Sequence, residues 1–128
     1  MALNRALRLR KNSDFQRVRQ QRRSVSSRLL ILAWAPNNLT SNSDSKTRIG
    51  FVVGKRISKR AVERNYIKRL LSEAIRPALV DLPGGMDIVI SAKNQVMGSD
   101  LHTLRHDIAT LLRRAQLLPS VHPSEASR

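Results

Sequence analysis

The alternation of apolar and polar stretches along the chain predicts three strands. An almost uninterrupted apolar run spans 28–35 (RLLILAWA), and shorter runs follow at 48–53 (RIGFVV) and 86–92 (MDIVISA). Apolar runs of this length that are bounded by turn residues are typical of strands, and the first has the composition of a strand buried on both faces. The loop between the first two runs, PNNLTSNSDSK, has a length that predicts a hairpin connection. We therefore expect these two strands to be antiparallel neighbours.

Two amphipathic segments predict the first and last helices. The first extends from about 14 to 20 behind a capping residue at Asn12 or Ser13, and Phe15 and Val18 form its packing pair at i, i+3. The last begins after Ser99 or Asp100 and continues to about residue 116. Its apolar positions recur at helical spacing and predict a core face: Leu101, Leu104, Ile108, Leu111, Leu112 and Ala115.

The central helix has the most unusual surface pattern. We expect it to run from about Ser58, which can act as the N-cap, to Ile75, because a residue before proline leaves the helical region. On an ideal wheel one side is apolar: Tyr66, Ile67, Leu70, Leu71 and Ala74. The opposite side is polar and mostly basic: Arg64, Asn65, Lys68, Arg69, Ser72 and Arg76. Four further cations precede it, at Lys55, Arg56, Lys59 and Arg60. A face of one sign costs self-repulsion unless it meets an anion, so the pattern favours binding over solvation.

The order helix, strand, strand, helix, strand, helix predicts an α+β fold. With two long helices packed on a small mixed sheet, this is a two-layer α-β sandwich. We expect one domain over 13–117, a basic arm over 1–12 and a flexible tail over 118–128. The arm holds Arg5, Arg8, Arg10 and Lys11, and the first helix with its following loop continues the positive charge through Arg17, Arg19, Arg22 and Arg23.

Composition points to a nucleic-acid partner. The 128 residues include 24 Lys and Arg but only 9 Asp and Glu, which gives a net charge of +15 and an isoelectric point near 11.8. Such an imbalance is typical of proteins that bind phosphate backbones. No apolar run approaches the roughly 18 residues that would span a bilayer, so a membrane is not the expected anion. Cysteine is absent, which excludes disulfides and thiolate metal sites.

No catalytic constellation is recognisable in the chain. There is no Ser/His/Asp set, no phosphate-binding glycine motif and no useful pair of carboxylates. His102 and His106 have metal-ligand spacing, but without a third ligand they read as a surface pair. Aromatic residues make up only 3% of the chain, too few for a stacking platform of the RNA-recognition-motif kind.

Several segments, taken in order, resemble the protein subunit of bacterial ribonuclease P. RAVERNYIKRLL is similar to the Arg-Asn-Arg signature helix of that family. LRKNSDFQRV near the start, RIGFVVGKRISKRAVERN through the signature and MDIVISAK after it agree in the same order. The resemblance covers roughly residues 7–112, and it argues against reading the basic N-terminus as a transit peptide.

The resemblance implies a fold and a function. The fold would contain a left-handed βαβ crossover that carries the signature helix, although right-handed crossovers are the rule. The protein would assist a catalytic RNA that, with Mg²⁺ held by the RNA and substrate, hydrolyses precursor tRNA to release its 5′ leader. The enzyme would thus be a ribonucleoprotein with no catalytic protein side chain. The chain would act in the cytoplasm as a protein monomer bound to the ribonuclease P RNA, with an organelle as the alternative compartment.

The resemblance also implies site residues. The RNA-binding set would be Lys55, Arg56, Arg60, Arg64, Asn65, Tyr66, Lys68 and Arg69, and the 5′ leader would contact Phe15, Arg19 and Lys93. Tyr66 stands where the family usually has an arginine; it can stack on a base or ribose and donate one hydrogen bond to phosphate. Arg19 and Ala33 stand where relatives often have aromatic residues. Trp34 points to the other face of a regular strand, so we expect it in the core.

Other classes remain open from the residues alone. A ribosomal or general RNA-chaperone protein is the main alternative, since such proteins are commonly small and basic. A helix-turn-helix DNA binder would need a second short helix before the basic one, where a strand is predicted instead. A protein-only nuclease would need clustered carboxylates that the chain does not show.

Overall fold

The computed structural model describes residues 9, 12–21, 23–36, 47–82 and 84–118. Its elements in chain order are α1 (Asn12–Gln20), β1 (Ser24–Ser26), β2 (Leu30–Pro36), β3 (Arg48–Val52), α2 (Ala61–Ile75), the 3-10 helix η2 (Arg76–Asp81), β4 (Met86–Ala92), the 3-10 helix η3 (Asn94–Val96) and α3 (Leu101–Arg114). The predicted basic arm, except Leu9 and Asn12, the 37–46 loop, Arg22 and the 119–128 tail lie outside the described residues.

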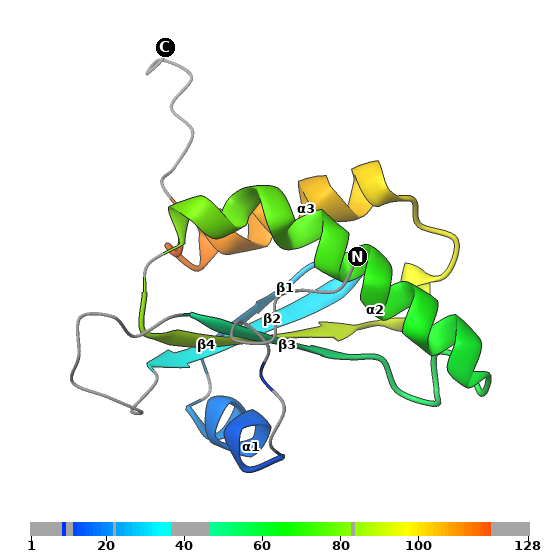
Figure 1. Cartoon of the computed structure of the whole chain (residues 1–128), viewed down its shortest axis with the longest axis horizontal. Coiled ribbons are helices and arrows are strands. Elements are labelled where there is room, and N and C mark those ends of the chain that lie inside the picture. Colours follow the sequence, from blue (N-terminus) through cyan, green and yellow to red (C-terminus); the bar gives the residue numbers. More distant parts are fainter. Residues whose placement is uncertain (1–8, 10–11, 22, 37–46, 83, 119–128) are drawn as a thin grey trace.

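The four strands form one mixed sheet in the order β1-β2-β4-β3. β2 pairs with β4 in antiparallel fashion, and β3 pairs with β4 in parallel, so β3, α2 and β4 form a βαβ crossover. The helices α2 and α3 cover one face of the sheet and the shorter α1 lies against the other (Figure 1). The predicted α+β class with a mixed sheet is therefore confirmed, whereas the left hand of the crossover stays a prediction.

The predicted hairpin between β2 and β3 is wrong, because β4 lies between them. The reason is burial. Asp87, Ile88, Val89 and Ile90 of β4 are all buried, so both faces of this strand are covered, as the centre of a sheet requires. In β3, by contrast, only Ile49 and Gly50 are buried, as an edge position allows. The edge strand β1 went unpredicted because SVS is too short and too polar to give a strand signal.

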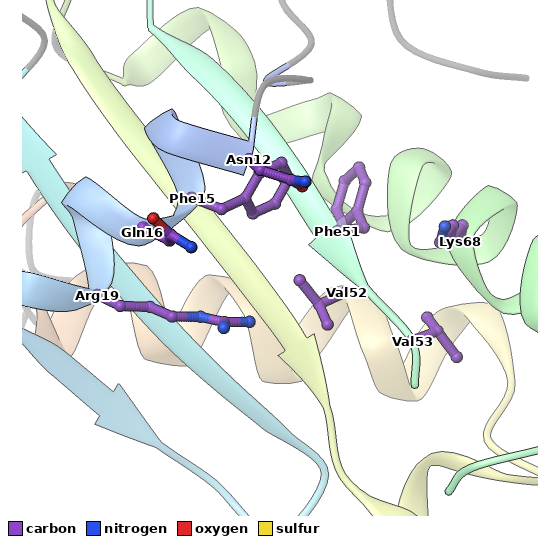
Figure 2. A pocket seen from close by; sticks show the side chains of 8 residues that line it. All are labelled: Asn12, Phe15, Gln16, Arg19, Phe51, Val52, Val53 and Lys68. Atoms are coloured by element: carbon purple, nitrogen blue, oxygen red, sulfur yellow. The ribbon is translucent and has the colours of Figure 1, made fainter. Parts of the chain in front are cut away.

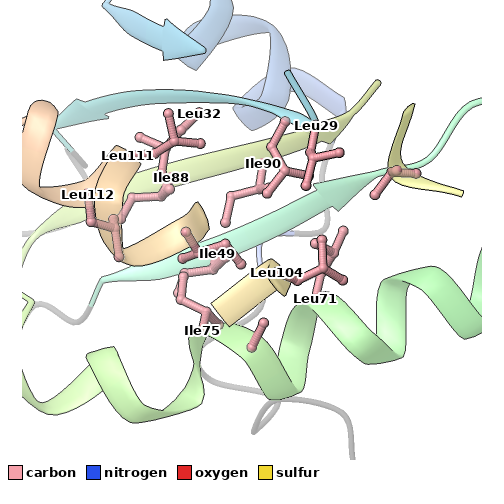
Figure 3. Packing of buried hydrophobic residues seen from close by; sticks show 14 of the residues in the cluster. Leu29, Leu32, Ile49, Leu71, Ile75, Ile88, Ile90, Leu104, Leu111 and Leu112 are labelled. Carbon is pink, nitrogen blue, oxygen red and sulfur yellow. The ribbon is translucent and has the colours of Figure 1, made fainter. Parts of the chain in front are cut away.

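The main core lies between the sheet and the two long helices. Leu32, Ile88 and Ile90 of the sheet meet side chains of α2 and α3 in one continuous apolar cluster (Figure 3). Trp34 packs against this cluster, whereas Ala33 packs against the smaller cluster under α1, which confirms that the two residues occupy opposite faces. The predicted apolar positions of α3 line the core or its margin, and Asp100 is its N-cap.

Both ends of α2 follow from local hydrogen bonding. The helix begins at Ala61 rather than Ser58, because Arg60 has the extended backbone of an N-cap (φ −84°, ψ 121°). The Ser58 hydroxyl accepts the Arg60 N–H at 3.1 Å and donates to Glu63, so it braces the approach instead of capping the helix. The predicted end before Pro77 is confirmed, since η2 replaces the α-helix from Arg76.

The buried side of α2 is rotated from the predicted one. Ile67, Leu71, Ala74 and Ile75 are buried, whereas Tyr66 is 58% exposed. Ser72, predicted on the outer face, is buried, and its hydroxyl donates to the Lys68 carbonyl at 3.0 Å. The rotation arises because α2 packs against α3 as well as the sheet. The serine tolerates burial because that hydrogen bond satisfies its hydroxyl.

Candidate nucleic-acid interface

The predicted RNA-binding residues gather on the outer face of α2 and on the turn before it. The side chains of Asn65, Tyr66, Lys68 and Arg69 on the helix are exposed, as are those of Lys55, Arg56 and Arg60 before it. The turn closes through a 3.0 Å hydrogen bond from the Ile57 N–H to the Gly54 carbonyl. The cations of this segment precede the N-terminal end of α2 in the chain and add positive charge next to the basic helix.

Arg64 differs from its neighbours on this face. Its side chain is only half-exposed, and its Nη1 donates to the Ser58 carbonyl at 2.9 Å. The same segment is held by the hydrogen bond between Ser58 and Glu63. Arg64 therefore braces the approach to α2, and replacing it would disturb this segment as well as any RNA contact.

A cleft of about 340 Å³ runs around the edge strand β3, between α1 and α2. Its lining residues come from three elements: Asn12, Phe15, Gln16 and Arg19 of α1, Phe51, Val52 and the adjacent Val53 of the β3 segment, and Lys68 of α2 (Figure 2). Apolar and aromatic walls thus stand next to two cations, Arg19 and Lys68. This combination suits a single nucleic-acid strand, whose bases stack and whose phosphates attract cations.

Phe15 approaches the sheet closely at Gly50, because this residue has no side chain. A Cβ atom on Gly50 would be 2.4 Å from Phe15 Cζ and 2.6 Å from Cε1, well inside van der Waals contact. Phe15 also packs against the small cluster formed by Leu9, Val18, Ala35 and Val89. The ring therefore has two functions at once: it anchors α1 and forms a wall of the cleft.

The other two predicted leader residues, Arg19 and Lys93, lie apart from each other. Arg19 lines the cleft and also a second hollow of about 330 Å³, where Ala33 and Ser91 contribute to the floor. Lys93 lines neither of these hollows; its Nζ donates to the Ser27 carbonyl at 2.6 Å. The structure thus brings Phe15, Arg19 and Lys68 together and leaves Lys93 beside the β1–β2 connection.

A buried ionic cluster fastens α1 to the sheet. Asp87, whose side chain is 0% exposed, accepts hydrogen bonds from Arg48 Nε at 3.0 Å and Nη2 at 2.8 Å, and it also pairs with Arg17. Arg17 in turn donates to the Pro36 carbonyl at 2.7 Å, and Asp14 lies 3.6 Å from Arg48. The hydrogen bonds to Asp87 raise the pKa of Arg48 above its ordinary value. Arg17 and Arg48, two of the basic residues that contribute to the net charge, thus hold α1 in place.

This cluster was not predicted from the sequence, because Arg17 was assigned to the basic surface. The available signal was Asp87 itself, an acid inside the otherwise apolar strand MDIVISA. A carboxylate in a strand with two covered faces needs cationic partners, since burying an unpaired charge costs several kcal/mol (order of magnitude).

The described residues contain no group of three or more His, Cys, Asp or Glu side chains that could hold a metal ion. His102 and His106 are exposed on α3. In the same part of the chain, no helix is long and apolar enough to cross a membrane. A basic helix face beside an open cleft on a mixed sheet is the surface of a small nucleic-acid-binding protein.

Comparison with known proteins identifies the family to which the chain belongs. The sequence profile of the family described as Ribonuclease P matches residues 3–116. The ribonuclease P protein component of Chloroflexus aurantiacus is 40% identical over 119 residues, which are 92% of this chain and 84% of that protein. The corresponding protein of Caldanaerobacter subterraneus subsp. tengcongensis is 36% identical over 109 residues, 85% of this chain and 89% of that one.

Solved structures agree. The structure of the Staphylococcus aureus RNase P protein superposes with a TM-score of 0.76 at 25% identity, covering 88% of this chain and 98% of that one. The RNase P protein from Thermotoga maritima gives a TM-score of 0.71 at 26% identity, with 84% and 96% covered. The chain belongs to the ribonuclease P protein family.

The family match confirms the resemblance seen in the sequence. The chain is a protein subunit of ribonuclease P, the ribonucleoprotein endoribonuclease of tRNA 5′-end processing in which RNA performs the catalysis. Nothing in these comparisons supports a ribosomal or RNA-chaperone protein instead.

Proposed function

We propose that the outer face of α2 and the turn before it bind the catalytic RNA, while the cleft around β3 binds the 5′ leader of precursor tRNA. The observation that carries this division is the position of Lys68. It belongs to the basic helix yet lines the same cleft as Phe15 and Arg19 of α1 (Figure 2). One helix therefore borders both proposed RNA surfaces.

Each surface suits its proposed ligand. Arginines such as Arg56, Arg60 and Arg69 can grip phosphates through two parallel hydrogen bonds, and Asn65 adds hydrogen bonds without charge. In the cleft, the Phe15 ring offers a stacking face for a leader base, while Arg19 and Lys68 attract its phosphates. Lys93 would meet the leader only beyond the cleft, since its ammonium is held by Ser27.

The magnesium ions in this proposal are held by the RNA subunit and the substrate, and they supply the electrostatic stabilisation for hydrolysis of the phosphodiester. Mg²⁺ prefers oxygen ligands and retains several waters, so RNA phosphates suffice as ligands. The protein, with its net charge of +15, reduces repulsion between two polyanions. We place this monomeric subunit, bound to ribonuclease P RNA, in the cytoplasm.

The first test is reconstitution. We expect the purified protein alone to leave precursor tRNA intact, and the protein with its RNA subunit to cleave at a lower magnesium concentration than the RNA alone. The measurement is cleavage rate over a magnesium series for protein, RNA and holoenzyme. Cleavage by RNA-free protein, or an unchanged magnesium requirement in the holoenzyme, would contradict the proposal.

The second test concerns the outer face of α2. Arg69→Ala should weaken binding of the RNA subunit and reduce the salt slope of the binding constant by about 0.7 to 0.9, the value for one lost phosphate contact. Arg69 suits this test better than Arg64, which also braces Ser58. The matched control is Arg105→Ala, an exposed arginine on α3. Equal losses for both variants would mean that general charge, not this face, binds the RNA.

A further inference from the structure

A second groove borders α2 on the side that faces away from the cleft. It measures about 440 Å³ and lies between α2 and the segment that leads into α3. Its lining residues are Glu63, Tyr66, Ile67, Leu70, Val96, Met97, Gly98, Ser99, Asp100 and Leu104. On an ideal helix Tyr66 and Lys68 lie about 160° apart, with Asn65 and Arg69 between them. The basic face therefore separates the cleft from this groove.

The groove exposes apolar side chains next to this basic face. Tyr66 is 58% exposed, Met97 46% and the neighbouring Val62 79%. The floor is formed by core side chains, among them Ile67 and Leu104, which are 5% and 1% exposed. An exposed aromatic ring beside an apolar floor, at the border of the proposed phosphate-binding surface, suits a stacked nucleobase.

The polar groups at the rim select among ligands. Glu63 and Asp100 place carboxylates there, and both already accept hydrogen bonds, Glu63 from Ser58 and Asp100 from the Thr103 N–H at 2.9 Å. The hydrogen bonds from Thr103 also lower the pKa of Asp100, so this group stays ionised at neutral pH. Two carboxylates repel a phosphate but can accept hydrogen bonds from the amino group of a base.

We propose that this groove binds one unpaired, amino-bearing nucleobase of the catalytic RNA, stacked on Tyr66, while Arg69 and Asn65 hold the adjoining backbone. The inference rests on the proposed function, because it places the catalytic RNA on the outer face of α2. It assigns Tyr66 to the RNA subunit and not to the leader, since the ring lies on the opposite flank of the helix from Lys68.

The experiment uses the full chain with in vitro transcribed ribonuclease P RNA of the same organism. Tyr66→Ala should weaken binding about 5- to 140-fold, the loss expected for one stacked base. Tyr66→Leu, which keeps apolar contact with the floor, should lose nearly as much, whereas Tyr66→Phe should bind within about threefold of the parent. Melting temperatures are measured alongside, and the salt slope should stay unchanged in all three variants.

A photoreactive phenylalanine analogue at position 66 then identifies the occupant. We expect a crosslink to one base of the ribonuclease P RNA in the holoenzyme, with or without precursor tRNA. A crosslink to the leader, to a second copy of the protein or to none of these would overturn the inference, as would parental affinity of Tyr66→Ala. A reduced salt slope in Tyr66→Ala would also overturn it, since it would indicate a phosphate contact.

Arg69→Ala separates this inference from the proposed function. If Arg69→Ala reduces the salt slope while Tyr66→Ala binds like the parent, the RNA-binding face stands and the base-binding groove fails. If neither variant differs from the parent, the outer face of α2 is not the RNA-binding surface, and both proposals fail.

Discussion

Asp87→Asn is expected to lower the free energy of unfolding by about 3 kcal/mol, which corresponds to a fall in melting temperature of roughly 10 to 20 °C for a domain of this size. The substitution keeps the shape of the side chain but removes the charge that Arg17 and Arg48 share. Breaking a buried pair typically costs about 3–5 kcal/mol. The low end applies because the two arginine side chains are 26% and 17% exposed, so water can partly replace the carboxylate.

Thermal and urea unfolding of the full chain measure this effect. The matched control is Asp81→Asn, an exposed aspartate at the end of η2, which should change stability by less than about 0.5 kcal/mol. The control removes the same charge from the protein, so it accounts for any change in general repulsion. Equal melting temperatures for the two variants would show that the Asp87 cluster contributes nothing to the fold.

The cluster also connects stability with function. It fixes α1, and α1 supplies Phe15 and Arg19 to the cleft. Below its melting temperature, Asp87→Asn should therefore bind precursor tRNA more weakly even where the sheet and α2 stay folded. Affinity for the catalytic RNA should change less, because α2 is held by its packing on α3 and the sheet.

Much of this fold could be predicted because its signals are local. The bounds of β4 are those predicted, the end of α2 follows from Pro77, and the apolar positions of α3 recur at helical spacing. The order of strands could not be predicted in the same way. Which strand occupies an inner position depends on how many of its faces are covered, and that depends on where α1 packs, which the sequence of this short helix does not specify.

The candidate site shows the same division. Exposure of Asn65, Lys68 and Arg69 was predictable from the wheel, since charged residues at helical spacing leave few alternatives. The burial of Ser72 and the exposure of Tyr66 were not, because α3 lies against one flank of α2 and shifts the buried stripe. The sequence did not predict that Lys68 lines the cleft, because the cleft is formed only when α1 and α2 lie on either side of β3.

Phe15 poses the remaining question, because its ring both anchors α1 and lines the cleft. Phe15→Ala would remove both functions and could not separate them. Phe15→Leu keeps apolar volume against Val18 and Val89, and a swap of this kind usually costs less than about 1.5 kcal/mol of stability. It removes the flat aromatic face, however, and a lost stacking contact with a base costs about 1–3 kcal/mol of binding.

Phe15→Leu is therefore expected to weaken binding of leader-bearing precursor tRNA to the holoenzyme about 5- to 140-fold, while mature tRNA binds as it does to the parent. Gly50→Ala should also reduce the preference for precursor over mature tRNA, because its Cβ would displace the Phe15 ring. Gly54→Ala is the matched control, since a Cβ there meets its nearest atom, the Arg56 amide nitrogen, only at 3.9 Å. The measurement is the ratio of the two dissociation constants for each variant. If Phe15→Leu weakens both RNAs equally or neither, the ring acts only as an anchor, and the leader is bound by Arg19 and Lys68 without a stacking face.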